Sequence, residues 1–159
     1  MKVIVIGSIA AGVSAAARLS ARERNPQITV YEAGAFHSCG AGGLPHYLGQ
    51  PLSALKEAIQ DKERELAARN ITARLRCQVQ SIDPASRQVT VRDLADGRIF
   101  QDRYDKLVAA TGAVPQIPQV PGADRVGIQT LKNVEDLIFL KEFVRTPYVR
   151  DIVILGGGW

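Results

Sequence analysis

The sequence predicts an α/β fold, in which helices cover a parallel β-sheet. Two short runs, Lys2–Ile6 and Ile28–Tyr31, are rich in the β-branched residues typical of buried parallel strands. Between them, Ala10–Arg24 has a helical pattern that ends before the Asn25-Pro26 pair. This β-α-β unit takes about thirty residues, the usual length for two strands joined by a crossover helix. A third apolar run, Lys106–Ala110, predicts another buried strand.

A longer helix is expected after the glycine-rich residues 34–51. Apolar residues between Leu52 and Leu66 recur on one face of this helix, which we expect to end near Asn70. Charged residues line its other face, as they do when a helix covers a sheet and faces water.

Three strands are expected next, at Ile71–Ile82, Gln88–Arg92 and Arg98–Tyr104. The Asp96-Gly97 pair between the last two is a strong hairpin signal. We therefore predict that residues from about Ile71 to Tyr104 form a three-stranded antiparallel insertion in the parallel sheet.

The last part of the chain is predicted to be mostly extended. Three prolines within Val114–Gly122 favour an extended connector, because proline restricts its own φ and disfavours helix at the preceding residue. A helix should follow, with Asn133 as its cap and Asp136 in its first turn. Asp151–Leu155 is predicted to be a further strand.

Composition argues against several partners and locations. The 159 residues are 46% apolar, enough for one compact core. The net charge of +4 arises from Lys and Arg spread among Asp and Glu, so no nucleic-acid binding is expected. Met1 leads straight into a strand without a leader or a long apolar segment, so we expect a cytoplasmic protein outside the membrane. His37 and His46 lack metal-ligand spacing, so no metal site is expected, and Cys77 is expected in the core.

The segment Gly7-Ser-Ile-Ala-Ala-Gly12 has the length and position of a phosphate-binding turn between a strand and a helix. Gly7 permits the tight turn, and Gly12 allows close contact between helix and strand. Ile9 stands where a middle glycine normally lets the backbone approach the phosphates. Glu32 ends the second strand, where a carboxylate can accept hydrogen bonds from the hydroxyls of a ribose.

This pattern alone leaves the nucleotide open between FAD and NAD. It is also compatible with a plain turn and a solvated Glu32. Glu32 does argue against a ligand with a 2′-phosphate, because carboxylate and phosphate would repel each other.

Further segments carry a resemblance to a known family. They are Val3–Gly12, Tyr31–Ser38, Gly43–Gly49, Tyr104–Ala113, Thr130–Asp136 and Val153–Gly158. Taken in order, they make the entire chain resemble the FAD-dependent pyridine nucleotide-disulfide oxidoreductases. Within this family the chain is similar to the single-cysteine branch, which comprises coenzyme A disulfide reductases, NADH oxidases and NADH peroxidases.

The resemblance implies a Rossmann-like FAD-binding domain that stops before the NAD domain is complete. It implies that residues 1–113 form the N-terminal half of the FAD domain and 114–150 a connector with a helix. Residues 151–159 would be the first strand and glycine turn of an NAD(P)-binding domain. The chain then looks like an N-terminal fragment, and the full-length protein is expected to be a homodimer.

The resemblance also assigns binding residues. FAD contacts fall on Gly7, Ile9, Ala10, Ala11, Gly12, Tyr31, Glu32, Ser38, Val79, Thr111 and Gly112. The adenine would lie near Val79 and the isoalloxazine near Ser38–Gly43. Coenzyme A contacts fall on Ser14, Arg18, Ser38 and Arg69. Arginines suit the phosphates of coenzyme A because they donate paired hydrogen bonds.

The redox cysteine of the family has two possible positions. A gap-free match places it at Gly42 and puts Cys39 where a phenylalanine is usual. A second match aligns Ser38-Cys39-Gly40 with the family's Ser-Cys-Gly, and it needs a deletion and a compensating insertion. We favour the gap-free match, since substitutions are more common than paired indels in an ordered loop. Cys39 is therefore a candidate, and a buried structural role for it stays open.

The expected function is that of an FAD-dependent NAD(P)H oxidoreductase of the coenzyme A disulfide reductase or NADH oxidase type. NAD(P)H would be the electron donor, and a disulfide such as coenzyme A disulfide, oxygen or peroxide the acceptor. One alternative is a thiol-independent flavoprotein resembling ferredoxin or rubredoxin reductases, which needs no cysteine. The other is a non-catalytic fragment of an FAD domain.

Overall fold

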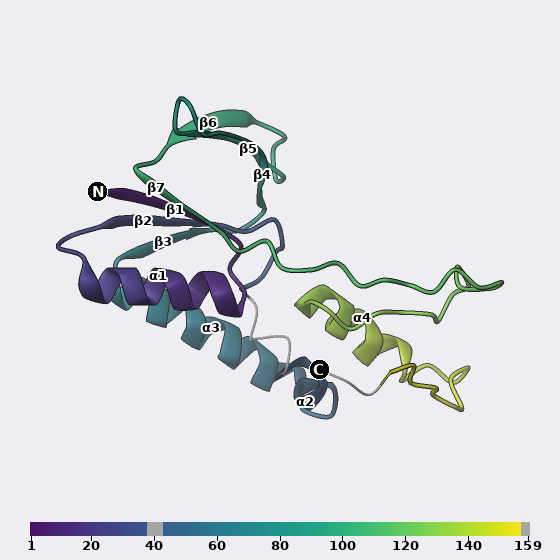
Figure 1. The fold of residues 1–159 in the computed structure, drawn as a ribbon. Helices are drawn as coiled ribbons and strands as arrows, with labels where there is room; N and C mark the ends of the chain where they lie inside the picture. Colours follow the sequence, from purple (N-terminus) through teal and green to yellow (C-terminus); the bar gives the residue numbers. More distant parts are fainter. Residues whose placement is uncertain (38–42, 157–159) are drawn as a thin grey trace.

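The computed structural model describes residues 1–37 and 43–156, with a four-stranded parallel sheet of order β3-β2-β1-β7 at its centre. The strand bounds are Lys2–Ile6 for β1, Gln27–Tyr31 for β2, Ile71–Arg74 for β3 and Lys106–Ala109 for β7. Helices α1 (Ala10–Arg22) and α3 (Leu52–Ala68) cover one face of this sheet, and a second sheet covers the other (Figure 1). The predicted α/β fold is confirmed, with α1 ending slightly earlier than expected.

The core lies on both faces of β1, because successive side chains of a strand point in opposite directions. Val3 and Val5 pack towards α1 and α3. Ile4 and Ile6 pack towards the second sheet. Each of these four side chains is at most 9% exposed. β1 is thus one of the two inner strands of the middle layer, and it is packed on both faces.

The second sheet is antiparallel, with the order β4-β5-β6. Its strands are Cys77–Asp83, Gln88–Asp93 and Ile99–Arg103. Between β5 and β6, Gly97 has a φ of +79°, the left-handed conformation that the Asp96-Gly97 pair predicts. The expected three-stranded antiparallel insertion is confirmed, although its start differs.

The predicted start of that insertion at Ile71 is wrong. The expected strand Ile71–Ile82 is divided, and its first part, β3, pairs in parallel with β2, beginning with Ile71 opposite Ile28. The insertion begins only at Cys77. The chain changes sheets at Arg76, which has a φ of 53°. No glycine, asparagine or proline marks this bend, so it could not be recognised as a turn from residue types.

Helices α2 (Leu44–Leu48) and α4 (Val134–Phe143) pack against the start of α3. The buried residues of this cluster are Leu44, Leu55, Ile59, Val134 and Leu137. The cap of α4 is confirmed: the Asp136 backbone N–H donates to Asn133 Oδ1 at 2.7 Å. The short α2 was not expected, because its length gives too little periodicity to recognise.

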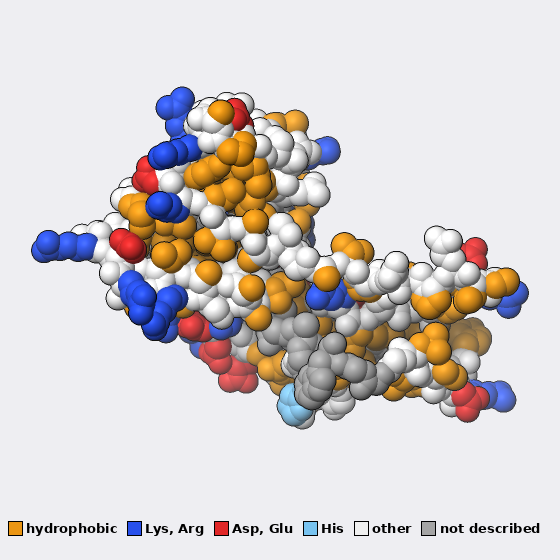
Figure 2. Space-filling view, in the orientation of Figure 1, with side chains coloured by type: hydrophobic (Ala, Val, Ile, Leu, Met, Phe, Trp, Pro, Cys, Tyr) orange, Lys and Arg blue, Asp and Glu red, His pale blue; other side chains and the backbone are white. Residues whose placement is uncertain are grey.

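Residues 110–133 connect β7 to α4 without helix or strand, as the prolines predict. Residues 110–156 extend away from the two sheets (Figure 1), and Figure 2 shows hydrophobic side chains, in orange, along this extension. The strand expected at Asp151–Leu155 is wrong, since these residues have no strand partner and Leu155 is 85% exposed. A parallel strand needs neighbours on its edges and faces, and the described residues provide none there. Within the described ranges, no helix is both long and apolar enough to cross a membrane.

Candidate functional site

The turn after β1 is shaped by two glycines that have no room for a side chain. Gly7 has a φ of +101°, and a Cβ added to it would lie 2.2 Å from the carbonyl oxygen of Ala110. A Cβ added to Gly12 would lie 1.9 Å from the carbonyl oxygen of Gly7. Both distances are far below van der Waals contact. The backbone of α1 therefore approaches the end of β1 closely, as the sequence pattern predicts.

The N-terminus of α1 faces outward from this turn. Ile9 is the N-cap, and no side chain among the described residues caps the helix there. The first turn of α1 carries no acidic residue. Ala10 and Ala11 are exposed, so backbone N–H groups without an intrahelical partner lie at the surface. This arrangement fits a bound anion such as a pyrophosphate.

The carboxylate of Glu32 lies beside the same turn. Its Oε2 accepts hydrogen bonds from the Ser8 backbone N–H at 2.8 Å and from the Ser8 hydroxyl at 3.0 Å. Its Oε1 accepts one from the Gly34 N–H at 2.8 Å. The Glu32 backbone is also held, since its carbonyl accepts from Cys77 N–H at 2.8 Å. A carboxylate and the helix N-terminus thus stand at one end of the parallel sheet.

The end of β7 forms another wall of the site. The Ala110 N–H donates to the Ile6 carbonyl at 2.8 Å. The backbone nitrogen of Thr111 lies 3.6 Å from the position of a Cβ on Gly7. Gly112 follows with a φ of +71° and is exposed, like Thr111. The structure therefore brings the residues after β1, β2 and β7 together.

Tyr31 and Val79, also candidate contacts, direct their side chains into the core between the two sheets. Tyr31 is 2% exposed, and its hydroxyl donates to Asp102 Oδ2 at 2.9 Å. Burial, and next the hydrogen bond with Asp102, raise the pKa of Tyr31 well above its usual range. Only the backbone of Tyr31 therefore lies near the glycine turn, where its carbonyl accepts a hydrogen bond from Gly7 N–H at 2.8 Å.

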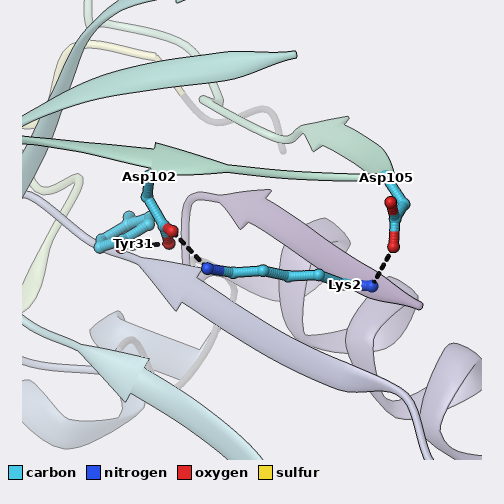
Figure 3. A network of polar contacts seen from close by, with 4 residues as sticks. All are labelled: Lys2, Tyr31, Asp102 and Asp105. Carbon is cyan, nitrogen blue, oxygen red and sulfur yellow. Dashed lines mark hydrogen bonds and ion pairs between the residues drawn. The ribbon is translucent and has the colours of Figure 1, made fainter.

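A polar network links the start of β1 to the insertion (Figure 3). The Lys2 ammonium forms an ion pair with Asp102, the acceptor for the Tyr31 hydroxyl. The Lys2 backbone N–H donates to Asp105 Oδ2 at 2.6 Å. A hollow of about 320 Å³ lies beside this network and is lined by neither the glycine turn nor Glu32. The network thus has the position of a structural junction.

The candidate coenzyme A contacts are not all near one another. Ser14 and Arg18 are exposed one turn apart on α1. Arg69 is the C-cap of α3, and its Nε lies 3.6 Å from Glu65 Oε1. It lies two residues before β3, which starts beside the beginning of β2, whereas Glu32 follows the end of β2. Arg69 therefore lies at the opposite end of the parallel sheet from Glu32.

The candidate redox positions Cys39 and Gly42, together with Ser38, lie outside the described residues. His37, just before them, is 3% exposed, and its Nδ1 has no hydrogen-bond partner within residues 1–37 and 43–156. Burial lowers the pKa of His37, although nearby Glu63 and Glu32 oppose this effect. The described part of the chain holds no cluster of metal-ligating side chains.

Ser8 is the contact that sequence reasoning missed. It lies inside the glycine segment at a position that any residue can occupy in the motif, so the pattern carries no signal for it. A polar residue directly after a buried strand, with an acidic residue at the end of the next strand, was the available clue. Its two hydrogen bonds to Glu32 connect the first turn to the second strand.

Comparison with known proteins agrees with this geometry. The family model described as pyridine nucleotide-disulphide oxidoreductase matches residues 1–159. The chain belongs to this family. Its α/β fold, with a parallel sheet and an antiparallel insertion, is the fold of family members of known structure.

Family relatives are similar along the entire chain. An NADH oxidase of Enterococcus faecalis is 32% identical over 100% of this chain and 35% of its own length. An NAD(P)H sulfur oxidoreductase (CoA-dependent) of Pyrococcus abyssi is 31% identical over 99% of this chain and 34% of its own length. The crystal structure of reduced Bacillus anthracis CoADR-RHD has a TM-score of 0.80 and 28% identity, and it covers 90% of this chain and 26% of that one. The chain spans about a third of the length of the two sequence relatives.

Proposed function

We propose that this chain contributes the first half of an FAD site to an NAD(P)H-dependent oxidoreductase. The observation that carries the proposal is the placement of Glu32 beside the glycine turn, 2.8 Å from the Ser8 backbone N–H. The α1 N-terminus and the Glu32 carboxylate fit the pyrophosphate and the adenosine ribose of a dinucleotide, respectively. Bound FAD would supply the hydride and electron transfer that protein side chains cannot perform.

Each described residue of the turn has a role in this proposal. Gly7 and Gly12 keep the backbone close, so that N–H groups at Ala10 and Ala11 can hold the pyrophosphate. Ile9 at the N-cap offers no side-chain acceptor that would compete with the pyrophosphate. Thr111 and Gly112 would line the side of the site opposite Glu32, and the insertion would place the adenine near Val79.

The division of the chain follows from this assignment. Residues 1–113 would form the N-terminal half of the FAD domain, and 114–150 a connector with α4. Residues 151–159 would begin an NAD(P)-binding domain. The exposed apolar side chains of residues 152–155 support the view that further protein covers them in the intact enzyme.

The electron acceptor is proposed from the relatives. Their names include an NADH oxidase, a CoA-dependent sulfur oxidoreductase and a coenzyme A disulfide reductase, which support oxygen or a disulfide such as coenzyme A disulfide as the acceptor. Peroxide is added from the family resemblance. For coenzyme A, exposed Ser14 and Arg18 stay the best-supported contacts. Arg69 is less well supported, because it lies at the other end of the parallel sheet.

We further propose a cytoplasmic homodimer for the intact protein. The free, buried thiol of Cys77 is compatible with a reducing compartment. The dimer follows from the family resemblance, and light scattering of the intact protein would test it.

Flavin binding tests the proposal directly. The purified chain should take up FAD and acquire flavin absorbance, and Glu32→Ala should weaken this uptake about tenfold or more, because it removes a charged acceptor. The matched control is Glu57→Ala, which changes an exposed glutamate of α3. Protein that stays colourless in excess FAD would favour the non-catalytic fragment instead.

A second experiment decides between thiol-dependent and thiol-independent enzymes. The intact protein is reduced with NADH and then mixed with coenzyme A disulfide, comparing wild type with Cys39→Ser. Loss of turnover only in the variant would place Cys39 in the reaction. Unchanged turnover would remove Cys39, and transfer to a ferredoxin or rubredoxin without disulfide turnover would support the thiol-independent alternative.

A further inference from the structure

Ser8 is fully buried, at 0% exposure, although it lies directly after the first glycine of a ligand-binding turn. Both of its donors point to one atom. The backbone N–H and the hydroxyl of Ser8 donate to Glu32 Oε2 at 2.8 and 3.0 Å. Gly34 N–H donates to the other oxygen, Oε1, at 2.8 Å. Most of the accepting capacity of the Glu32 carboxylate is therefore used by the protein itself.

A count of acceptor positions shows what is left for a ligand. An ionised carboxylate has about four lone-pair positions, two on each oxygen. Ser8 takes both positions on Oε2, and Gly34 takes one on Oε1. Within residues 1–37 and 43–156, no group takes the remaining position on Oε1. The ribose of an adenine nucleotide, however, presents two neighbouring hydroxyl donors.

We propose that Ser8 restricts Glu32 to a single ribose hydroxyl, so that the site recognises one hydroxyl of the adenosine ribose through Glu32 Oε1. This inference rests on the proposed function, because it requires an adenine nucleotide at the glycine turn. Ser8 is then a positioning residue that sets the specificity of the site through Glu32. It has no need to touch the ligand.

The Ser8 hydrogen bonds should persist when a nucleotide binds. The Ser8 backbone is held by Gly7, whose N–H donates to the Tyr31 carbonyl at 2.8 Å. The hydroxyl lies away from water, so leaving the carboxylate would strand a buried donor. A hydrogen bond to an ionised acceptor is also among the stronger ones in proteins. A ribose hydroxyl would therefore have to displace a well-held neighbour to reach Oε2.

The test compares the binding of ADP, 2′-deoxy-ADP and 3′-deoxy-ADP to the full chain by isothermal titration calorimetry. For wild type, one deoxy compound should bind about tenfold or more weakly than ADP, because a hydrogen bond to the carboxylate is lost. The other should bind within about twofold of ADP. For Ser8→Ala, which frees a position on Oε2, both deoxy compounds should bind clearly more weakly than ADP. Ser53→Ala, an exposed serine of α3, is the control and should keep the wild-type pattern.

The possible outcomes separate this inference from the proposed function. If wild type binds ADP and both deoxy compounds lose affinity equally, the role of Ser8 is overturned, while the proposed nucleotide site still stands. An asymmetric pattern that Ser8→Ala leaves unchanged would also overturn it. Binding of neither ADP nor FAD by wild type would overturn the proposed function and this inference with it. The wild-type comparison needs no variant, so equal losses there would overturn the inference even if Ser8→Ala does not fold.

Discussion

The close packing of the glycine turn can be tested at a single residue, Gly12. Gly12→Ala would bring a Cβ to 1.9 Å from the Gly7 carbonyl oxygen, so backbone must move. We expect the free energy of unfolding to fall by about 2 to 4 kcal/mol, measured by urea denaturation. Gly49→Ala is the control, because no atom lies within 4 Å of its added Cβ, and it should change stability by less than about 0.5 kcal/mol. Equal effects would contradict the close packing at Gly12.

Buried His37 predicts a loss of stability in mild acid. Burial lowers its pKa in the folded protein, so below about pH 6.5 the unfolded chain binds a proton that the folded chain does not. Stability should therefore fall as the pH drops from about 6.5 towards the lower pKa of the folded state. The urea midpoint at pH 7 and pH 5 measures this. His37→Leu should lessen the difference, whereas His46→Gln, at an exposed histidine, should keep it.

Buried Tyr31 predicts a loss of stability at high pH. Its pKa is raised by burial and by the hydrogen bond to Asp102, so above about pH 10 the unfolded chain loses a proton that the folded chain keeps. Stability should thus decline as the pH rises beyond about 10. The urea midpoint of Tyr31→Phe should depend less on pH in this range than that of wild type. An identical slope for the two proteins would show that Tyr31 is not protected.

At this scale, the sequence predicted residues whose backbone role depends on residue type. Gly7 and Gly12 were recognisable because only glycine fits the turn, and Glu32 because it ends a strand at a defined distance from them. The side-chain hydrogen bonds of Ser8 to Glu32 and of Tyr31 to Asp102 were not, since these partners are set by how β2 and the insertion pack on β1. Such contacts join residues distant in sequence and have no local pattern.

Among the elements, α4 is joined to α2 by a buried cation. Lys141 is 4% exposed, and its ammonium donates to the carbonyl oxygens of Tyr47, Leu48 and Gln50 at 2.8, 2.9 and 2.5 Å. These carbonyls lie at the end of α2, where helical carbonyls lack partners and a positive charge is favourable. One side chain thus satisfies the backbone at the end of α2.

Removal of that cation should destabilise the contact between α2 and α4. Lys141→Met keeps the length of the side chain but leaves the three carbonyls without their donor, so we expect a loss of about 2 to 4 kcal/mol in urea denaturation. Lys141→Arg should recover part of this stability. The control Lys56→Met changes an exposed lysine of α3 and should have little effect. If Lys141→Met left the free energy of unfolding unchanged, water would have replaced the ammonium as the donor.

The element boundaries show what could be predicted and what could not. The capping box of α4 is local, so Asn133 and Asp136 marked that helix correctly. Lys141 could have been noticed, because it follows Val134 and Leu137 at helical spacing on a buried face. The division of β3 from β4 had no such clue, since apolar residues continue through the bend at Arg76.

At the scale of the whole molecule, the compact body and the extension differ in backbone pairing. Arg125 and Arg150 are exposed and lie outside helices and strands. Arg92 and Arg103 are also exposed, but they belong to β5 and β6. Protease accessibility requires local opening of the chain, which costs more free energy where the backbone is paired.

Limited trypsin digestion should therefore cut the extension first. We expect early cleavage after Arg125 or Arg150 and late cleavage after Arg92 and Arg103. Mass spectrometry of the fragments at successive times measures this order. FAD should leave this order unchanged if it binds the glycine turn. Early cuts in β5 or β6 would indicate that the insertion opens more readily than its pairing suggests.

The order in which the chain is synthesised gives the position of β1 a further consequence. β1 is synthesised before the other strands of the parallel sheet, yet one of its two partners, β7, comprises residues 106–109 and is the last of these strands to be made. At about 5 to 20 residues per second, one edge of β1 waits roughly 5 to 20 seconds for its partner on the ribosome. During that time β1 can pair with β2 alone. The unpaired edge of this apolar strand is then a site at which we expect a chaperone to bind.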